Sequence, residues 1–252
     1  MPGKVIVITG ASSGIGAALA ELVAGQGATL VLVARRDAAL LAVATRCGDA
    51  AYPIVADMTL RDDVRRVVRE TLARFGRIDV WVNNVGRGIT RYPSELTDDD
   101  VDEMMRINVK SALYGTQEIL PHFKSRGEGH VVTISSILGR IPFAVHRSAY
   151  NGAKHFLNAL IANFRAEVGQ SHPGIHFSLI SPGPVQTEFG RSALHGGPDS
   201  WQLPDAQSAA EVAAVIAGVI DSRRADVYTR PGYHARVVKY FDELGQDPET
   251  RR

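Results

Sequence analysis

Tyr150 and Lys154 lie four residues apart in the stretch SAYNGAKHF (148–156), with only small residues between them. If this stretch is helical, positions i and i+4 share a face, so a phenol would lie near an ammonium group. The phenol of a free tyrosine has a pKa of about 10 and is an inert donor at neutral pH. A nearby cation lowers that pKa, and the tyrosine can then give or take a proton in catalysis. Such a pair also arises by chance, as an apolar cap and a solvated lysine, so the rest of the chain has to decide.

The elements that would position this pair alternate between strands and helices. Apolar runs typical of buried strands occupy 4–9, 28–34, 52–57, 78–85, 130–136, 175–182 and 225–230. Helical periodicity occupies 14–27, 36–48, 60–76, 149–168 and 207–221, and a further helix begins after Thr97, a suitable N-cap. Strands that are apolar on both faces predict a parallel sheet covered by helices on each side. We therefore predict one α/β domain over residues 1–252, a doubly wound parallel sheet of about seven strands with a lid at about 188–206.

A glycine-rich turn, TGASSGIG (9–16), follows the first strand and opens the first helix. Gly10, Gly14 and Gly16 permit a tight turn and let backbone N–H groups approach a pyrophosphate at the helix N-terminus. The strand–turn–helix context is the one that dinucleotide binding requires, although the spacing differs from the commonest form. The alternative is a plain glycine-rich turn.

The second strand ends in VLVARRD (31–37) and bears on the choice of cofactor. In NAD-binding proteins an acidic residue near this point accepts hydrogen bonds from the ribose 2′-hydroxyl. Here that position holds Ala34, followed by Arg35 and Arg36, and a guanidinium suits a 2′-phosphate. We predict NADP(H), with Arg35 as the main contact and Arg36 as the secondary one. The alternative is that both arginines are ordinary surface residues at the start of a helix.

Composition argues against several other classes of protein. The formal net charge is +1, which gives no global attraction to nucleic acid or to an acidic membrane. Cys47 is the single cysteine, so no internal disulfide forms, and no apolar run approaches the ~20 residues of a membrane span. The N-terminus is interpreted as a strand, not a signal peptide, and a cytoplasmic location is expected. No metal site is predicted, because Pro173-Gly174 interrupts the pair His172 and His176.

Over roughly residues 4–188 the chain resembles the short-chain dehydrogenase/reductase family in its Tyr-x-x-x-Lys form. TGASSGIG resembles the cofactor turn of the family, NNVG (83–86) its NNAG motif, and RINV contains its helix asparagine. SSILG (135–139), YNGAK (150–154) and SPGPVQT (181–187) resemble the serine, Tyr-Lys and nicotinamide-contact motifs. The resemblance implies a Rossmann-like fold that binds NAD(P). The expected cofactor-binding residues are Gly10, Ser12, Ser13, Gly14, Ile15, Gly16, Arg35, Arg36, Asp57, Met58, Asn84, Gly86, Tyr150, Lys154, Pro182, Gly183, Val185 and Thr187.

The resemblance also assigns catalytic roles. Tyr150 would exchange the proton with a substrate carbonyl or alcohol, and Ser136 would hydrogen-bond the carbonyl oxygen as negative charge develops. Lys154 would lower the pKa of Tyr150 and bind the nicotinamide ribose, and Asn108 would hold a water that links Lys154 to solvent. Ser135 is the alternative serine, but Ser136 fits the S-x-x-G pattern of this segment.

Two features depart from the family pattern. The interval between Ser136 and Tyr150 is one residue longer than usual, and Arg87 follows NNVG directly, where it would line the site or pair with a surface acid. One apolar wall for the substrate is expected from Ile137, Leu138, Phe143 and Val145, and the lid would contribute Phe189, Leu194, Trp201 and Leu203. Packing in the core or at an interface is the alternative for these residues. The apolar residues would favour a hydrophobic ketone or alcohol. The nearby basic residues would instead favour an anionic substrate group, and they are His146, His195, Arg140, Arg147 and Arg191.

The function predicted is an NADP(H)-dependent oxidoreductase that moves a hydride between the nicotinamide and a carbonyl or alcohol substrate. The alternatives are a catalytically silent NADPH-binding or scaffold protein, and another Rossmann-like enzyme such as a nucleotide-sugar epimerase or a methyltransferase. The partner expected is a small molecule, with no nucleic acid and no membrane span. The broad apolar faces of helices 101–123 and 149–168, by the same resemblance, predict a homodimer or homotetramer.

Overall fold

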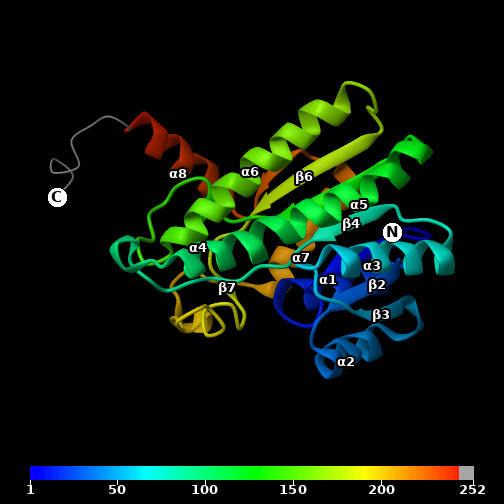
Figure 1. The fold of residues 1–252 in the computed structure, drawn as a ribbon, viewed down its shortest axis with the longest axis horizontal. Coiled ribbons are helices and arrows are strands. Elements are labelled where there is room, and N and C mark those ends of the chain that lie inside the picture. The colour runs from blue at the N-terminus through cyan, green and yellow to red at the C-terminus, as the bar shows by residue number, and fades with distance from the viewer. Residues whose placement is uncertain (244–252) are drawn as a thin grey trace.

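A seven-stranded sheet, all of it parallel, runs through the centre of the protein (Figure 1). The structure is a computed structural model, and it describes residues 1–243. The strand order is β3-β2-β1-β4-β5-β6-β9, so the direction of winding reverses between β1 and β4. The strands are β1 (Val5–Thr9), β2 (Thr29–Ala34), β3 (Ala51–Val55), β4 (Val80–Asn83), β5 (Gly129–Ile134), β6 (Ile175–Ser181) and β9 (Asp226–Tyr228).

Helices cover both faces of the sheet because the central strands bury side chains on both sides. In β1, Ile6 and Ile8 belong to one apolar core and Val7 to another. The first core is closed by α1 (Gly14–Gly25), α2 (Asp37–Cys47) and α7 (Ala209–Ser222), and the second by α3 (Arg61–Phe75), α5 (Ser111–Arg126) and α6 (Ser148–Gly169). The predicted doubly wound, single-domain α/β architecture is therefore confirmed.

The helix predicted after Thr97 is interrupted. It begins as α4 (Asp98–Met105) with a capping box, in which the Thr97 side chain accepts from the Asp100 N–H and the Asp100 side chain accepts from the Thr97 N–H. A π-helical segment, Arg106–Lys110, then joins α4 to α5. Single π turns inside helices are frequent at functional sites, and this one contains Asn108.

Three other features differ from the sequence prediction. The strands expected over 130–136 and 175–182 end earlier, at Ile134 and Ser181. A separate two-stranded ribbon, β7 (Val185–Gln186) and β8 (Gln207–Ser208), brackets the predicted lid. The chain also forms an eighth helix, α8 (Pro231–Asp242), for which no helix was predicted, whereas the polar tail 246–252 lies outside the described residues. No helix within residues 1–243 is long and apolar enough to cross a membrane.

Candidate active site

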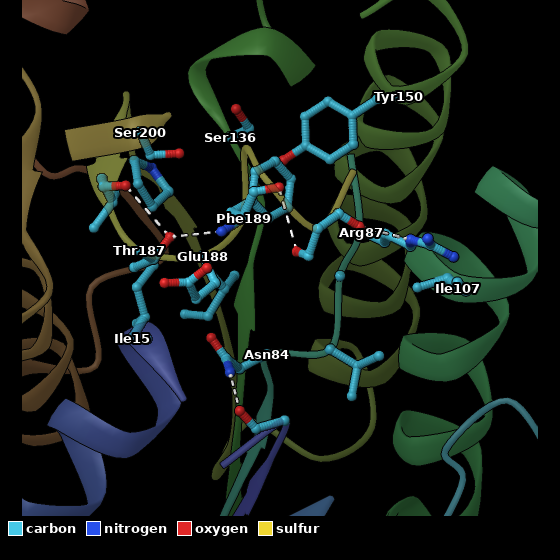
Figure 2. A pocket seen from close by; sticks show the side chains of 18 of the residues that line it. Ile15, Asn84, Arg87, Ile107, Ser136, Tyr150, Thr187, Glu188, Phe189 and Ser200 are labelled. Atoms are coloured by element: carbon cyan, nitrogen blue, oxygen red, sulfur yellow. Dashed lines mark hydrogen bonds between the residues drawn. The ribbon is translucent and has the colours of Figure 1, made fainter. Parts of the chain in front are cut away.

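A cavity of about 750 Å³ opens at the carboxyl ends of the strands, beside the reversal between β1 and β4. Open α/β sheets bind their ligands at this position. Figure 2 shows Tyr150, Ser136 and Phe189 together at one end of the drawn region and Asn84 and Ile15 toward the other. The predicted site residues that line the cavity are Gly10, Ser12, Ser13, Gly14, Ile15, Arg35, Arg36, Asp57, Met58, Asn84, Gly86, Ser136, Ile137, Leu138, Phe143, Tyr150, Lys154, Pro182, Gly183, Val185, Thr187 and Phe189.

The glycine turn between β1 and α1 is packed too tightly for side chains. Gly10 has φ +66°, and a Cβ on Gly16 would lie only 2.4 Å from the Gly10 carbonyl oxygen. The Asn84 side-chain amide, which follows β4, donates to the carbonyls of Thr9 and Gly10 at 3.1 and 3.2 Å. Gly16 therefore lies beneath the turn, not on the cavity wall, and Asn84 fixes the shape of the turn.

Two arginines follow β2 and have different partners. The Arg36 guanidinium donates to the hydroxyls of Ser12 and Ser13 at 3.0 and 2.7 Å. Arg35 instead pairs with Asp57 at 3.5 Å. Burial raises the pKa of Asp57, but hydrogen bonds from Thr59 and the charge of Arg35 outweigh it and hold that pKa below its usual value. Arg36 therefore carries a charge that no carboxylate within residues 1–243 offsets.

This half of the cavity fits a dinucleotide phosphate. Because Gly10 and Gly16 have no side chains, the turn packs tightly and its backbone lies close to any ligand. Cβ atoms at these two positions would collide with Asn84 or with the turn itself. Arg36 lies over the two serines of that turn, where it would meet a phosphate group. The residues thus agree with the phosphate-binding role that the sequence predicted for this turn.

The hydroxyls of Ser136 and Tyr150 meet at the other end of the cavity. Burial raises the pKa of Tyr150 to about 12, while the hydrogen bond from Ser136 and the charge of Arg147 lower it. Ser136 also accepts a hydrogen bond from the Leu138 N–H at 3.1 Å. The Ser135 hydroxyl instead donates to the Asn158 side-chain oxygen. The arrangement agrees with the preference for Ser136 over Ser135.

Lys154 lies beside Tyr150 as the i, i+4 spacing predicts, with its nitrogen 5.7 Å from the centre of the phenol ring. It is 2% exposed and donates to the Ile134 carbonyl at 3.0 Å. Burial lowers the pKa of Lys154 to about 7. Burial is the larger influence on the phenol in this structure and raises its pKa, so the expected lowering of the Tyr150 pKa by Lys154 stays a prediction.

Asn108 is fully buried behind the cavity in the π-helical segment. Its side chain accepts from the Arg87 N–H at 3.1 Å and donates to the Arg87 carbonyl at 2.9 Å. A Cβ on Gly86 would lie 3.2 Å from the Asn108 side-chain oxygen and 3.7 Å from the Lys154 nitrogen, so the glycine keeps open the space between them. The Arg87 side chain lines the cavity, donates to the Ser192 carbonyl at 2.9 Å and pairs with Glu103 at 3.8 Å.

Asn158 joins the serine segment to α6, and sequence reasoning missed it. Its side-chain nitrogen donates to the Gly139 carbonyl at 2.7 Å, and its oxygen accepts from Ser135. A Cβ on Gly139 would lie 2.9 Å from the Lys154 carbonyl, so only glycine lets the segment approach the helix this closely. These contacts fix Ser136 relative to Tyr150. A 3₁₀ turn (Ile137–Gly139) and an irregular loop fill the interval between the two residues.

The substrate end of the cavity is bounded by apolar side chains from two segments. The Phe189 ring meets the Tyr150 ring edge-on at 5.5 Å between centroids, and Phe143 and Leu203 also line the wall. The structure places Val145, 56% exposed, outside the cavity, which corrects its expected role as part of the wall. Lid residues that sequence reasoning missed are Glu188, Ser192, Pro198 and Ser200, and no periodic pattern marks them.

The lid is docked onto the loop after β4. Leu194 and Ile89 form a β-bridge, with hydrogen bonds from Leu194 N–H to the Gly88 carbonyl and from Thr90 N–H to the Leu194 carbonyl at 2.8 and 3.0 Å. Leu194 thus packs against this loop, and Trp201 is 45% exposed, so neither closes on the cavity as expected. Within residues 1–243 no group of three His, Cys, Asp or Glu side chains is placed to hold a metal ion.

Comparisons with known proteins agree with this architecture. A family model described as short chain dehydrogenase matches residues 4–196. An uncharacterized oxidoreductase of Staphylococcus saprophyticus is 34% identical over 187 residues, covering 74% of this chain and 76% of that protein. The dehydrogenase/reductase SDR family member 7B of Danio rerio is 33% identical over 241 residues, covering 89% and 76%.

Solved structures show the same fold. An alcohol dehydrogenase of the archaeon Thermococcus sibiricus, complexed with 5-hydroxy-NADP, has a TM-score of 0.79 at 28% identity, covering 91% of this chain and 97% of that one. A short-chain dehydrogenase from Streptomyces avermitilis has a TM-score of 0.85 at 30% identity, covering 96% and 94%. Because the family model matches more than half of the chain and these relatives agree with it, the protein belongs to the short-chain dehydrogenase/reductase family of oxidoreductases.

Proposed function

We propose that the protein is an NADP(H)-dependent oxidoreductase that interconverts carbonyl compounds and alcohols. The observation that carries this proposal is one cavity with two distinct ends. At one end the buried side chains of Tyr150 and Ser136 lie together, and at the other Arg36 lies over a glycine turn. The first arrangement suits proton exchange at a carbonyl oxygen, and the second suits a dinucleotide that bears an additional phosphate.

The residues toward the cofactor support NADP(H) over NAD(H). Position 34 is an alanine, so no carboxylate there accepts hydrogen bonds from a ribose 2′-hydroxyl. We infer that Arg36 makes the main contact to the 2′-phosphate and Arg35 the secondary one, because Asp57 already engages Arg35. This reverses the order that the sequence predicted for the two arginines. When bound, the nicotinamide cofactor supplies the hydride.

The chain's own groups would manage the proton. With its pKa near 12, Tyr150 keeps its proton at neutral pH and can donate it to a substrate oxygen during reduction, or accept one during oxidation. The Ser136 hydroxyl can turn its proton toward the same oxygen as negative charge develops. Lys154 has one N–H committed to the Ile134 carbonyl, which leaves two to stabilise a phenolate or to bind a ribose. Asn108 and Gly86 border the space through which Lys154 would exchange protons with water.

The association state is part of the same proposal. We infer a homodimer or homotetramer in the cytoplasm, with α5 and α6 at the subunit interface. Phe156 on α6 is 51% exposed and offers apolar surface for such a contact.

The test is Tyr150→Phe, which removes one oxygen and keeps the ring that packs against Phe189. Turnover of any ketone accepted by the wild type should fall about 10²–10⁴-fold, the range for loss of a general acid. NADPH affinity, measured by fluorescence titration, should stay within about threefold, because no phosphate contact is lost. Tyr114→Phe on α5 is the matched control and should leave both quantities unchanged.

The outcomes separate the competing functions. Unchanged turnover in Tyr150→Phe would remove this phenol as the proton donor. Saturable NADPH binding by the wild type, with no turnover across a broad panel of ketones and alcohols, would favour the silent binding protein instead.

A further inference from the structure

Of the five basic side chains that could favour an anionic substrate group, only His146 and Arg147 line the cavity. The other three each have a carboxylate partner, which weakens any attraction for an anionic ligand. These pairs are Arg140 with Asp226, Arg191 with Asp199 at 2.7 Å and His195 with Asp100 at 2.6 Å.

Of the other two, His146 has its pKa lowered by burial and by the charge of Arg147, so it is neutral at pH 7. Arg147 is 7% exposed and has no carboxylate partner among residues 1–243. Its side chain makes one hydrogen bond, from Nη1 to the Ile89 carbonyl at 3.0 Å. A guanidinium has five N–H donors, so most of those on Arg147 have no acceptor in the described part of the chain.

Arg147 also lies where a substrate would meet it. It lines the cavity and precedes Tyr150 by three residues at the start of α6. The two side chains interact electrostatically, because the charge of Arg147 lowers the pKa of Tyr150. A Cβ built on Gly88 would lie 2.7 Å from Arg147 Nη1 and 3.0 Å from the Phe189 ring, which places the guanidinium and that ring side by side.

We propose that Arg147 binds a carboxylate group of the substrate, so that the preferred substrates are oxo acids or hydroxy acids with an apolar body. A buried charge without a partner is unfavourable, and a carboxylate would offset it with two parallel hydrogen bonds. The apolar body would lie against Phe143 and Phe189. This inference rests on the proposed oxidoreductase function and names the substrate class for it.

The experiment compares matched acids and esters. Aryl ketones that carry a carboxylate two to four carbons from the carbonyl, such as 4-oxo-4-phenylbutanoate, are assayed with NADPH beside their neutral methyl esters. The wild type should reduce the acids with a kcat/KM at least about 10-fold above that of the esters. Arg147→Met should lower kcat/KM for the acids by about 10–100-fold, the range for a lost charged hydrogen bond, and change the esters by no more than about threefold.

Two further variants separate direct binding from other effects. Arg147→Lys keeps the charge and should restore part of the preference for acids. Arg191→Met removes the same charge from a residue outside the cavity and should leave the preference within about twofold, since exposed charges are screened by salt. Equal losses for acids and esters in Arg147→Met would show that Arg147 only holds the Ile89 carbonyl, and would overturn the proposal, as would a wild type without preference.

A binding measurement distinguishes failure of this inference from failure of the proposed function. If the wild type reduces none of these ketones, the proposed function fails for this substrate class, and the anion site is judged from thermal shifts with NADPH present. The probes are 4-phenylbutyrate and the neutral 4-phenylbutanamide. A saturable shift with the carboxylate alone, lost in Arg147→Met, supports the site, whereas equal shifts or none overturn it.

Discussion

Replacing Arg36 by alanine tests how the protein selects its cofactor. Among residues 1–243, the guanidinium of Arg36 has only the hydroxyls of Ser12 and Ser13 as partners, at 3.0 and 2.7 Å. Both hydroxyls can turn to solvent when the arginine is removed, so the fold should tolerate the change. The lost interaction is that of a guanidinium with a doubly charged phosphate.

The magnitude follows from the exposure of the arginine. Hydrogen bonds to charged groups contribute about 1.5–3 kcal/mol, which corresponds to about 10–150-fold in affinity. Arg36 is exposed, and salt at about 0.15 M screens its charge, so we expect the lower part of this range, a 10–30-fold rise in the Kd for NADPH. Arg35→Ala should raise that Kd by only about 3–10-fold, because Asp57 offsets part of the Arg35 charge.

The assay is fluorescence titration of each variant with NADPH and with NADH. The Kd for NADH should stay within about twofold in both variants, since NADH has no 2′-phosphate. The matched control is Arg46→Ala, which removes the same charge from the other end of α2, where Arg46 pairs with Glu21 at 2.8 Å. Equal losses for the two cofactors would refute the selection mechanism, and a larger effect of Arg35→Ala would restore the order predicted from the sequence.

Two further predictions concern Lys154 and Gly16. The pKa of Lys154 is about 7 in the fold and 10.5 in the unfolded chain, so between these values the unfolded state binds the extra proton and the free energy of unfolding rises with pH. When the free energy of unfolding is measured by urea titration at pH 7–9 and plotted against pH, its slope should be up to about 1.4 kcal/mol per pH unit steeper in the wild type than in Lys154→Met. Parallel slopes would contradict the burial of a neutral amine. Gly16→Ala places a methyl group 2.4 Å from the Gly10 carbonyl and should lower stability by about 1–3 kcal/mol, with weaker NADPH binding. An unchanged midpoint of thermal unfolding in this variant would show that the turn can relax.

Much of the fold was predictable because local sequence patterns agree with the global architecture. The buried strands read as apolar runs, and both cores draw on those runs, with Ile6 and Val7 of β1 facing opposite sides. Strand ends were less predictable. The residues after Ile134 are again small or apolar, so the sequence gives no sign that the strand ends there. Ser135 donates to Asn158 of α6, a contact between distant parts of the chain that no local pattern predicts.

The candidate site likewise contains residues whose positions the sequence predicted and residues whose roles it did not. Tyr150 and Lys154 come together because one helix places both on a face, so their spacing alone predicts their proximity. Asn158 is one of three asparagines in an amphipathic helix, and its role appears only when Gly139 packs against it. The different partners of Arg35 and Arg36 were equally hidden, because Arg35 pairs with Asp57, which follows a different strand, β3.

Burial, unlike sequence spacing, indicates which of the Tyr150 phenol and the Lys154 amine holds a proton. Tyr150 and Lys154 are both almost inaccessible, and desolvation disfavours the charged form of each. The phenol therefore keeps its proton, with a pKa near 12, while the amine can lose one near pH 7. A site in this state is prepared to donate a proton from the phenol. The Ile134 carbonyl accepts from only one N–H group of Lys154, and the lysine would act as a cation when a ligand supplies acceptors for the others. Cofactor binding and activation of Tyr150 would then be coupled through the Lys154 side chain.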